Sequence, residues 1–218
     1  MPGNSVQTLY TQRAKLYQFF FIDFLKWGKV LETFFQENAY LHPGMKILDA
    51  GCGTGSVTRV LHGLALRKDL DRITFHAFDL TPAMLEMFRQ WVEKEKVQGI
   101  QFRQANVLDL ENQLPADWSG YDLIVSSAML EYIPKEKISQ ALSNLRRLLG
   151  KNGRLLILVT KQTWIAKWTA AKWWKTNLFN REDLEIQLRE AGFPTIQKKK
   201  LPDSWDSFMM AIEAGVNS

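Results

Sequence analysis

The sequence predicts an α/β fold in which a mostly parallel, seven-stranded sheet carries helices on both faces and ends in a C-terminal antiparallel hairpin. Two observations predict it. Short apolar runs of strand length alternate along the chain with segments of helical periodicity. Glycine, proline and asparagine punctuate the junctions between them. Such alternation builds a parallel sheet through right-handed crossovers, so we expect a ligand beyond the carboxyl ends of the strands.

The N-terminal segment from Val6 to Asn38 is predicted to be helical, because aromatic and aliphatic residues recur at helical spacing. A turn signal, His42-Pro43-Gly44, follows it. We therefore expect an N-terminal helical cap, residues 1–40, ahead of a single larger domain, residues 41–218.

The larger domain opens with alternating elements. Expected strands are Lys46–Ala50, Arg72–Asp79, Ile100–Ala105, Tyr121–Ser126 and Arg154–Thr160. The unbroken apolar run of the fourth of these indicates burial on both faces. Expected helices are Ser56–Ala65, Pro82–Lys96, Lys135–Leu149 and a last one from Asn180 to Ala191.

Cap residues support two of these helices. Thr81 precedes Pro82, the order that helix starts favour. Asn180 is a good N-cap, and Gly192 is typical of a helix end. Two late strands, Thr195–Lys200 and Ser207–Ala214, flank a Pro/Asp turn and predict the antiparallel hairpin.

The most informative motif spans residues 47–55 and reads Ile-Leu-Asp-Ala-Gly-Cys-Gly-Thr-Gly. It joins the first strand to the first helix of the domain, and its glycines allow a sharp bend close to a ligand. The spacing is G-x-G-x-G, whereas a dinucleotide turn needs G-x-G-x-x-G/A. Asp49 before the loop would repel a pyrophosphate. An acid beside the free N–H groups of a helix start suits a ligand with an amino-acid head.

This motif, LDAGCGTG, resembles the first motif of class I S-adenosylmethionine-dependent methyltransferases, and the chain as a whole is nearest to small-molecule, quinone-biosynthesis-like members. The resemblance extends from about Tyr10 to Ala214. Residues 78–85, FDLTPAML, resemble the second-strand motif. The resemblance implies that Asp79 accepts hydrogen bonds from both ribose hydroxyls of the cofactor, a charge-assisted pairing.

Two further motifs follow in the order of the family. Residues 104–107, QANV, end the third strand where the family contacts adenine, with Asn106 in a position that is Asp in many relatives. Residues 121–132 resemble the fourth-strand motif and place Ser126 near the methionine part. The cofactor-binding residues that the resemblance implies are Asp49, Gly51, Cys52, Gly53, Gly55, Asp79, Leu80, Asn106, Val107 and Ser126, and no metal is expected.

The catalytic residue is left open by the sequence. Methyl transfer depends mainly on positioning, and a base is needed only when the nucleophile must lose a proton. The candidates are Tyr17, Glu131 and Tyr132. Residues 10–17 resemble the Y-x-x-x-A-x-x-Y cap of quinone-biosynthesis-type methyltransferases, and Glu131 and Tyr132 follow the fourth strand.

The segment 161–175 interleaves four tryptophans with four lysines. This mixture is typical of an apolar body that meets a wet or anionic surface. It leaves three roles open: peripheral contact with a membrane, contact with substrate, or packing. Together with the aromatic residues from Phe19 to Trp27, it predicts an apolar or aromatic small-molecule acceptor.

Two other function classes stay open. The net charge of +5 is concentrated in residues 151–200, with 11 Lys/Arg and 4 Asp/Glu, and suggests a nucleic-acid methyltransferase. Against it, the fourth-strand motif lacks the [DNS]-P-P-[YFW] pattern of base methylation, and no separate cysteine nucleophile is present. The third class is a cofactor-binding protein without catalysis. The lone cysteine favours a reducing cytoplasm, no apolar run reaches the ~20 residues of a membrane span, and the oligomeric state is not specified.

Overall fold

A computed structural model describes residues 27–162 and 177–217. The chain divides after Asn106 into two compact units, which are described separately. Their described residues form seven strands, three in the first unit and four in the second. Three of the strand pairings within the units are parallel and two are antiparallel.

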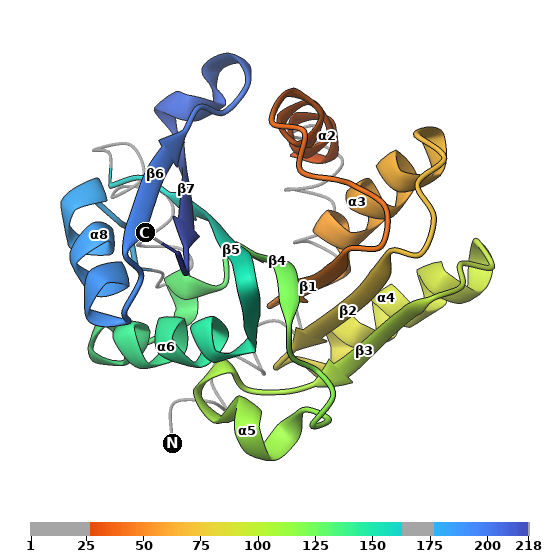
Figure 1. Ribbon diagram of the computed structural model, residues 1–218, viewed down its shortest axis with the longest axis horizontal. Coiled ribbons are helices and arrows are strands. Elements are labelled where there is room, and N and C mark those ends of the chain that lie inside the picture. The colour runs from red at the N-terminus through yellow and green to blue at the C-terminus, as the bar shows by residue number, and fades with distance from the viewer. Residues whose placement is uncertain (1–26, 163–176, 218) are drawn as a thin grey trace. The chain divides into compact units, whose positions relative to one another are not determined.

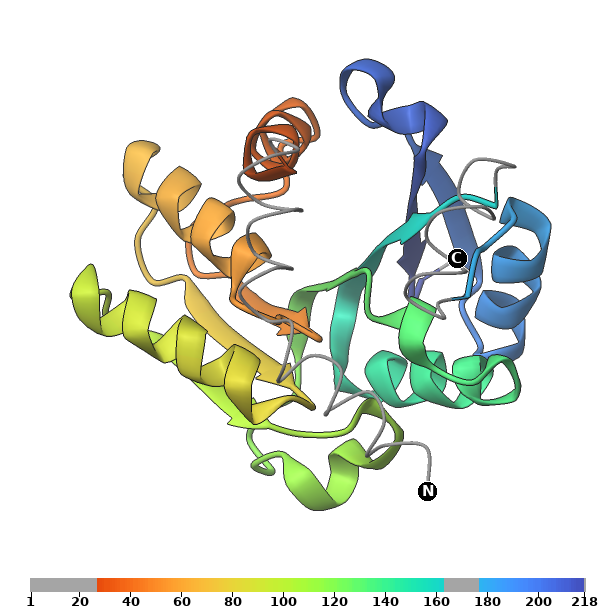
Figure 2. The ribbon, with the colours of Figure 1, turned by 180° about the vertical axis from the view of Figure 1, so that it is seen from behind.

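The first unit is a parallel β-sheet with helices packed on it. Its elements are α2 (Trp27–Glu37), β1 (Lys46–Ala50), α3 (Ser56–Arg67), β2 (Thr74–Asp79), α4 (Pro82–Lys94) and β3 (Ile100–Gln104). Strand β2 lies between β1 and β3 and pairs with both in parallel. Helices α3 and α4 run side by side along one face of these strands (Figures 1 and 2), and α2 packs on α3. The carboxyl ends of all three strands therefore share one edge.

The second unit begins with short helices before its sheet. Its elements are η2 (Val107–Asp109), α5 (Leu110–Gln113), β4 (Tyr121–Ser127), η3 (Leu130–Tyr132), η4 (Lys135–Lys137), α6 (Ile138–Leu148), β5 (Leu149–Thr160), α8 (Arg181–Glu190), β6 (Thr195–Lys199), η5 (Asp203–Ser207) and β7 (Met209–Gly215). Strand β5 pairs with β4 in parallel and with β7 in antiparallel, and β6 completes the hairpin on β7. Helices α6 and α8 lie side by side against this sheet (Figure 2).

The predicted α/β class, with mostly parallel strands and a C-terminal antiparallel pair, is confirmed. Burial explains why these runs form strands: the apolar side chains of β1, β4, β5 and β7 are almost fully excluded from solvent. Asn180 caps α8 as predicted, because its Oδ1 accepts the Asp183 N–H at 2.7 Å. Gly192 follows the helix with a φ of 89°, the left-handed geometry expected at a helix end.

Several boundaries differ from the predictions. Strand β2 begins at Thr74 because Arg72 adopts a φ of 56°, outside the extended region. Helix α6 begins at Ile138 after a 3₁₀ turn, and β5 begins at Leu149, so the chain is already extended where a helix end and a loop were expected. A 3₁₀ helix, η5, replaces the start of the last predicted strand. Helix α2 is the described part of the predicted N-terminal helix, and the remainder of that prediction lies outside the described residues.

Among the helices of the described residues, none has the length and apolar character needed to cross a bilayer.

Candidate functional site

The glycine loop after β1 is held by backbone hydrogen bonds and three left-handed glycines. Gly51, Gly53 and Gly55 have φ values of 71°, 53° and 85°. These conformations are costly for residues with a Cβ atom. The N–H groups of Gly51 and Cys52 both donate to the Phe78 carbonyl at 2.9 Å, which ties the loop to β2.

Two of the glycines serve different purposes. A Cβ atom on Gly55 would lie 2.3 Å from the aromatic ring of Phe88 on α4, so this glycine allows the loop to pack on the helix. A Cβ atom on Gly53 would meet none of the described residues within 4 Å, so among these residues the backbone there is open. Gly53 is therefore the position at which a ligand can approach the main chain.

Asp79, the last residue of β2, is fixed at the same edge. Its Oδ2 accepts the Gly53 N–H and its Oδ1 accepts the Thr81 N–H, each at 2.8 Å. The Thr81 side chain and the Leu80 backbone also hydrogen-bond this carboxylate. Burial raises the pKa of this carboxyl, and the backbone donors oppose the rise. Asp79 thus presents a rigid pair of acceptors beside the glycine loop.

Asp49 lies inside β1 with 2% of its surface exposed. Its Oδ2 accepts two hydrogen bonds from Thr58 on α3, from the backbone N–H at 3.0 Å and from Oγ1 at 2.7 Å. Burial raises the pKa of Asp49 to about 7, with a smaller contribution in the same direction from Asp79. Its Oδ1 accepts no hydrogen bond from the described residues and remains available for an external donor.

The start of α3 offers further donors. Helix N-termini carry backbone N–H groups without intrahelical partners. Among the described residues, those of Ser56 and Val57 donate to no protein group, whereas the N–H of Thr58 is taken by Asp49. The hydroxyl of Thr54, in the loop itself, is buried and has no hydrogen-bond partner among the residues that the structure describes. This arrangement places free donors beside the free acceptor of Asp49.

The remaining cofactor candidates divide between the two units. Leu80 follows Asp79 directly, and Asn106 comes two residues after β3, next to the backbone bond from the Ala105 N–H to the Asp79 carbonyl at 3.0 Å. Cys52 packs in an apolar cluster with Phe88, and burial raises the pKa of its thiol well above the usual value. The thiol is therefore protonated and unreactive at neutral pH.

Val107 and Ser126 belong to the second unit. Val107 is buried at the start of η2, and its carbonyl accepts a bond from Asn144 Nδ2 at 2.9 Å. Ser126 lies near the end of β4 with no exposed surface, and its hydroxyl makes no hydrogen bond to the described residues.

Glu131, in η3, connects the ends of two strands. Its Oε1 accepts the backbone N–H of Thr160, the last residue of β5, at 2.6 Å, and its main-chain carbonyl accepts the Asn177 N–H at 2.7 Å. Glu131 is 5% exposed, and burial raises its pKa to about 7, against the opposing Thr160 bonds. The Thr160 side chain also hydrogen-bonds this carboxylate. The neighbouring Tyr132 is half-buried, and Tyr17 lies outside the described residues.

Several residues that hold these side chains were not predicted. Thr58 holds Asp49, and Gln104 holds the Leu80 carbonyl through its Nε2 at 3.2 Å. Asn177 supports η3, because its Nδ2 donates to the Ile133 carbonyl at 2.5 Å. The sequence indicated a supporting role for Thr58, since it is the third residue of a predicted helix, where backbone donors are free. No pattern in the sequence indicated such a role for Asn177.

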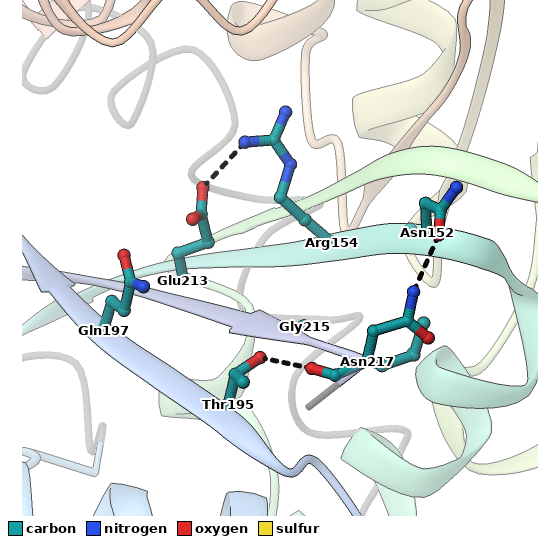
Figure 3. A pocket seen from close by; sticks show the side chains of 9 residues that line it. Asn152, Arg154, Thr195, Gln197, Glu213, Gly215 and Asn217 are labelled. Carbon is teal, nitrogen blue, oxygen red and sulfur yellow. Dashed lines mark hydrogen bonds and ion pairs between the residues drawn. The ribbon is translucent and has the colours of Figure 1, made fainter.

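A polar hollow of about 240 Å³ lies elsewhere in the second unit, at the start of β5 and the end of β7 (Figure 3). Glu213 points into it and forms ion pairs with Arg154 at 3.5 Å and Lys199 at 3.3 Å. The hollow lies at the amino end of β5, away from the edge where parallel strands bind ligands. It is therefore not the predicted site.

The basic character of the late segment is partly neutralised in the structure. Lys161 and Lys198 both pair with Asp206, at 3.5 Å and 2.9 Å, while Lys199 pairs with Glu213. A nucleic-acid interface needs cations that are free to meet phosphates. These three lysines give that interpretation no support.

The chain matches a protein-family model described as a methyltransferase domain over residues 41–208. It is 33% identical over 111 residues to malonyl-[acyl-carrier protein] O-methyltransferase of Paenibacillus sp. strain JDR-2, covering 51% of this chain and 37% of that protein. It is 29% identical over 167 residues to the chloroplastic 2-methyl-6-phytyl-1,4-hydroquinone methyltransferase 1 of rice, covering 75% of this chain and 46% of that protein. The chain thus spans less than half the length of both relatives.

Solved structures agree on the fold. Magnesium protoporphyrin IX methyltransferase from Synechocystis PCC 6803, solved with S-adenosylhomocysteine bound, superimposes with a TM-score of 0.62 at 19% identity, covering 87% of this chain and 81% of that one. The family match covers most of the chain and includes the glycine loop, Asp49 and Asp79. The chain therefore belongs to the methyltransferase-domain family, and its resemblance to class I S-adenosylmethionine-dependent methyltransferases is confirmed.

Proposed function

We propose that this protein binds S-adenosylmethionine at the carboxyl edge of β1 and β2 and transfers its methyl group to a small, apolar or aromatic acceptor. The arrangement of Asp79 is the main support. Its Oδ2 and Oδ1 accept the Gly53 and Thr81 N–H groups, each at 2.8 Å, so the carboxylate is held in a fixed orientation beside the glycine loop. Two adjacent hydroxyl groups on a ribose match such a pair of acceptors.

The residues around Asp79 fit the rest of the cofactor. The free Oδ1 of Asp49 accepts from the ammonium of the amino-acid tail, and the N–H groups of Ser56 and Val57 donate to its carboxylate. The open space above Gly53 admits the ligand to the main chain. When bound, the cofactor supplies a methyl group made electrophilic by the sulfonium; the chain supplies the placement.

Four further residues complete the proposed site. Leu80 and Asn106 flank Asp79 at the ends of β2 and β3, where the adenine ring would be recognised. Val107 and Ser126, from the second unit, are proposed as further cofactor contacts, because Val107 is apolar and the buried Ser126 hydroxyl makes no hydrogen bond to the described residues. A buried hydroxyl without a hydrogen bond is costly, so a ligand that provides a partner is favoured.

The acceptor is proposed from the chain's own residues and from its relatives. One relative, aligned over 75% of this chain, is named for a hydroquinone that carries a methyl and a phytyl group, and this name favours an apolar aromatic acceptor. Glu131 is the proposed base for such an acceptor, because burial raises its pKa to about 7 and a base works best near the operating pH. Tyr132 and Tyr17 are the other proposed contacts to the acceptor.

Calorimetry tests the cofactor site directly. Wild-type protein should bind S-adenosylhomocysteine, and Asp79→Asn should weaken binding by about 100-fold, because two charge-assisted bonds are replaced by weaker ones. Asp71→Asn, an exposed acid in the loop before β2, is the matched control and should leave the affinity unchanged. Equal affinities for wild type and Asp79→Asn would show that the cofactor does not bind at this carboxylate.

The acceptor is tested by methyl transfer from labelled S-adenosylmethionine to three pools: alkylated hydroquinones, acyl-carrier-linked acids and RNA. We expect turnover with the first pool. Glu131→Gln should keep its affinity for S-adenosylhomocysteine while the rate with a hydroquinone falls by about 100-fold. Methylation of RNA alone would contradict the proposal, and cofactor binding without turnover in any pool would indicate a non-catalytic protein.

A further inference from the structure

A side chain outside the glycine loop controls the electrostatics of the proposed cofactor site. Thr58 is the third residue of α3, and both of its donors point to one oxygen of Asp49. Gly55, at the N-cap position, has no side chain to cap the helix, so the carboxylate of Asp49 satisfies a free N–H of the first turn from the neighbouring strand. Helix α3 and Asp49 therefore hold each other in place.

The two carboxylate oxygens of Asp49 differ in their hydrogen bonding. Oδ2 is saturated by Thr58, and Oδ1 has no donor among the described residues. Since the two oxygens are rigidly linked, fixing Oδ2 fixes the direction of Oδ1. We propose that Thr58 is a positioning residue: its hydroxyl keeps Asp49 ionised and aims Oδ1 at the ammonium of the cofactor tail, so that Thr58 sets the pH range in which the cofactor is captured.

The pKa of Asp49 depends on its burial, its hydrogen bonds and the charges close to it. Burial is the largest effect and raises the pKa of Asp49, while both Thr58 bonds lower it. Asp79 adds repulsion, and among the described residues the Cys52 thiol, which burial keeps protonated, also feels the charge of Asp49. The net pKa is about 7, so the wild-type carboxylate is half ionised at neutral pH. Removing the hydroxyl removes one of the two interactions that favour the charged form.

The inference rests on the proposed function and predicts a specific pH profile. A protonated Asp49 cannot pair with an ammonium, so the affinity of wild-type protein for S-adenosylhomocysteine should fall below pH 7, approaching tenfold per pH unit. Thr58→Val removes the hydroxyl and keeps the backbone donor. Its profile should shift to higher pH by about one to two units, because hydrogen bonds to charged groups contribute that much. At pH 7 its affinity should be roughly tenfold lower.

Two controls separate this role from a structural one. Thr58→Ser retains the hydroxyl and should keep the wild-type midpoint. The second control is 5′-methylthioadenosine, which has the nucleoside but no amino-acid tail, so its affinity should not follow the ionisation of Asp49. Calorimetry in two buffers of different ionisation enthalpy adds a readout besides affinity: proton release on binding at pH 7 should be greater for Thr58→Val than for wild type.

The possible results are distinct. A wild-type and a Thr58→Val profile with the same midpoint would overturn the inference while leaving the proposed function intact. An equal shift with 5′-methylthioadenosine would also overturn it, because the titrating group would then lie near the nucleoside. Failure of wild-type protein to bind S-adenosylhomocysteine at any pH would overturn the proposed function instead. If Thr58→Val does not fold, Thr58→Ala provides the same comparison.

Discussion

The edge of the first unit at β1 and β2 and the edge of the second unit at β4 and β5 both present buried carboxylates, but they are built differently. In the first, Asp49 and Asp79 accept hydrogen bonds whose donors all lie between residues 53 and 81. In the second, Glu131 accepts hydrogen bonds from Thr160, and its main-chain carbonyl accepts the N–H of Asn177. The cofactor edge is thus encoded in one short stretch of chain, whereas the proposed acceptor edge is assembled from distant segments.

The largest effect is expected in the glycine loop of the first edge. Gly55→Ala places a methyl group 2.3 Å from the Phe88 ring on a left-handed backbone, and the combined strain and overpacking should lower the free energy of unfolding by about 3 kcal/mol. Gly53→Ala faces open space and should cost about 1 kcal/mol. Chemical denaturation measures both.

Comparison of Gly55→Ala with Gly53→Ala separates the effect of loop packing on stability from the effect of a blocked ligand position on binding. Gly53→Ala should weaken binding of S-adenosylhomocysteine more than its small stability loss suggests, because its methyl group enters the space proposed for the ligand. If Gly55→Ala were as stable as wild type, the loop would not depend on α4, and the view of this edge as a rigid, locally encoded structure would be wrong.

A somewhat smaller effect is expected at the second edge from Glu131→Gln. The folded-state pKa of about 7 lies above the ordinary value of 4.5, so between these values the folded protein binds more protons than the unfolded chain. The stability of wild type therefore falls as pH rises through this window. Glutamine keeps an acceptor for the Thr160 N–H and does not titrate, so the variant should gain about 2.5 kcal/mol relative to wild type between pH 5 and pH 8.

The measurement is the difference in free energy of unfolding between Glu131→Gln and wild type at the two pH values, which cancels the titration of all other groups. A pH-independent difference would mean that Glu131 is better solvated than its burial indicates. It would also remove the reason for proposing Glu131 as a base, since an ordinary carboxyl is a weak base at neutral pH.

The contrast between the two edges explains what the sequence predicted. The strands, the glycine loop and the acid ending β2 all produce local patterns, and the structure places them as expected. The partner of Glu131 is 29 residues away, and Asn177 is farther still. Strand order alone brings these residues together, so no local pattern reports them. The early start of β5 was not predicted: Leu149 pairs with Tyr121 and Arg154 pairs with Leu123, and the register between these pairs is irregular.

Other expectations remain predictions. The helical cap of residues 1–40 and the role of Tyr17 depend on residues that precede Trp27, and the tryptophan- and lysine-rich stretch lies almost wholly between residues 163 and 176; both regions are outside the described residues. Cytoplasmic location is likewise untested, and one relative is chloroplastic. These regions hold most of the residues from which an apolar acceptor was inferred. The methyl-transfer assay with the three acceptor pools is therefore the test of the acceptor class.

The smallest effects should come from two amides that hold main-chain carbonyls next to proposed cofactor residues. Asn144 Nδ2 donates to the Val107 carbonyl at 2.9 Å in a partly buried position, and Gln104 Nε2 donates to the Leu80 carbonyl at 3.2 Å in an exposed one. Asn144→Ala should cost about 1 kcal/mol of stability and Gln104→Ala about half of that, because water can replace the exposed bond.

Their effects on cofactor binding refine the comparison of the two units. Leu80 is also fixed by its neighbour Asp79, which the glycine loop holds independently, so Gln104→Ala should leave the affinity for S-adenosylhomocysteine within about twofold of wild type. Val107 lacks such support from the glycine loop, and Asn144→Ala should weaken binding by about threefold to fivefold, within the range of one lost hydrogen bond. The opposite order, measured by calorimetry at pH 7.5, would show that the second unit holds its part of the site as rigidly as the first.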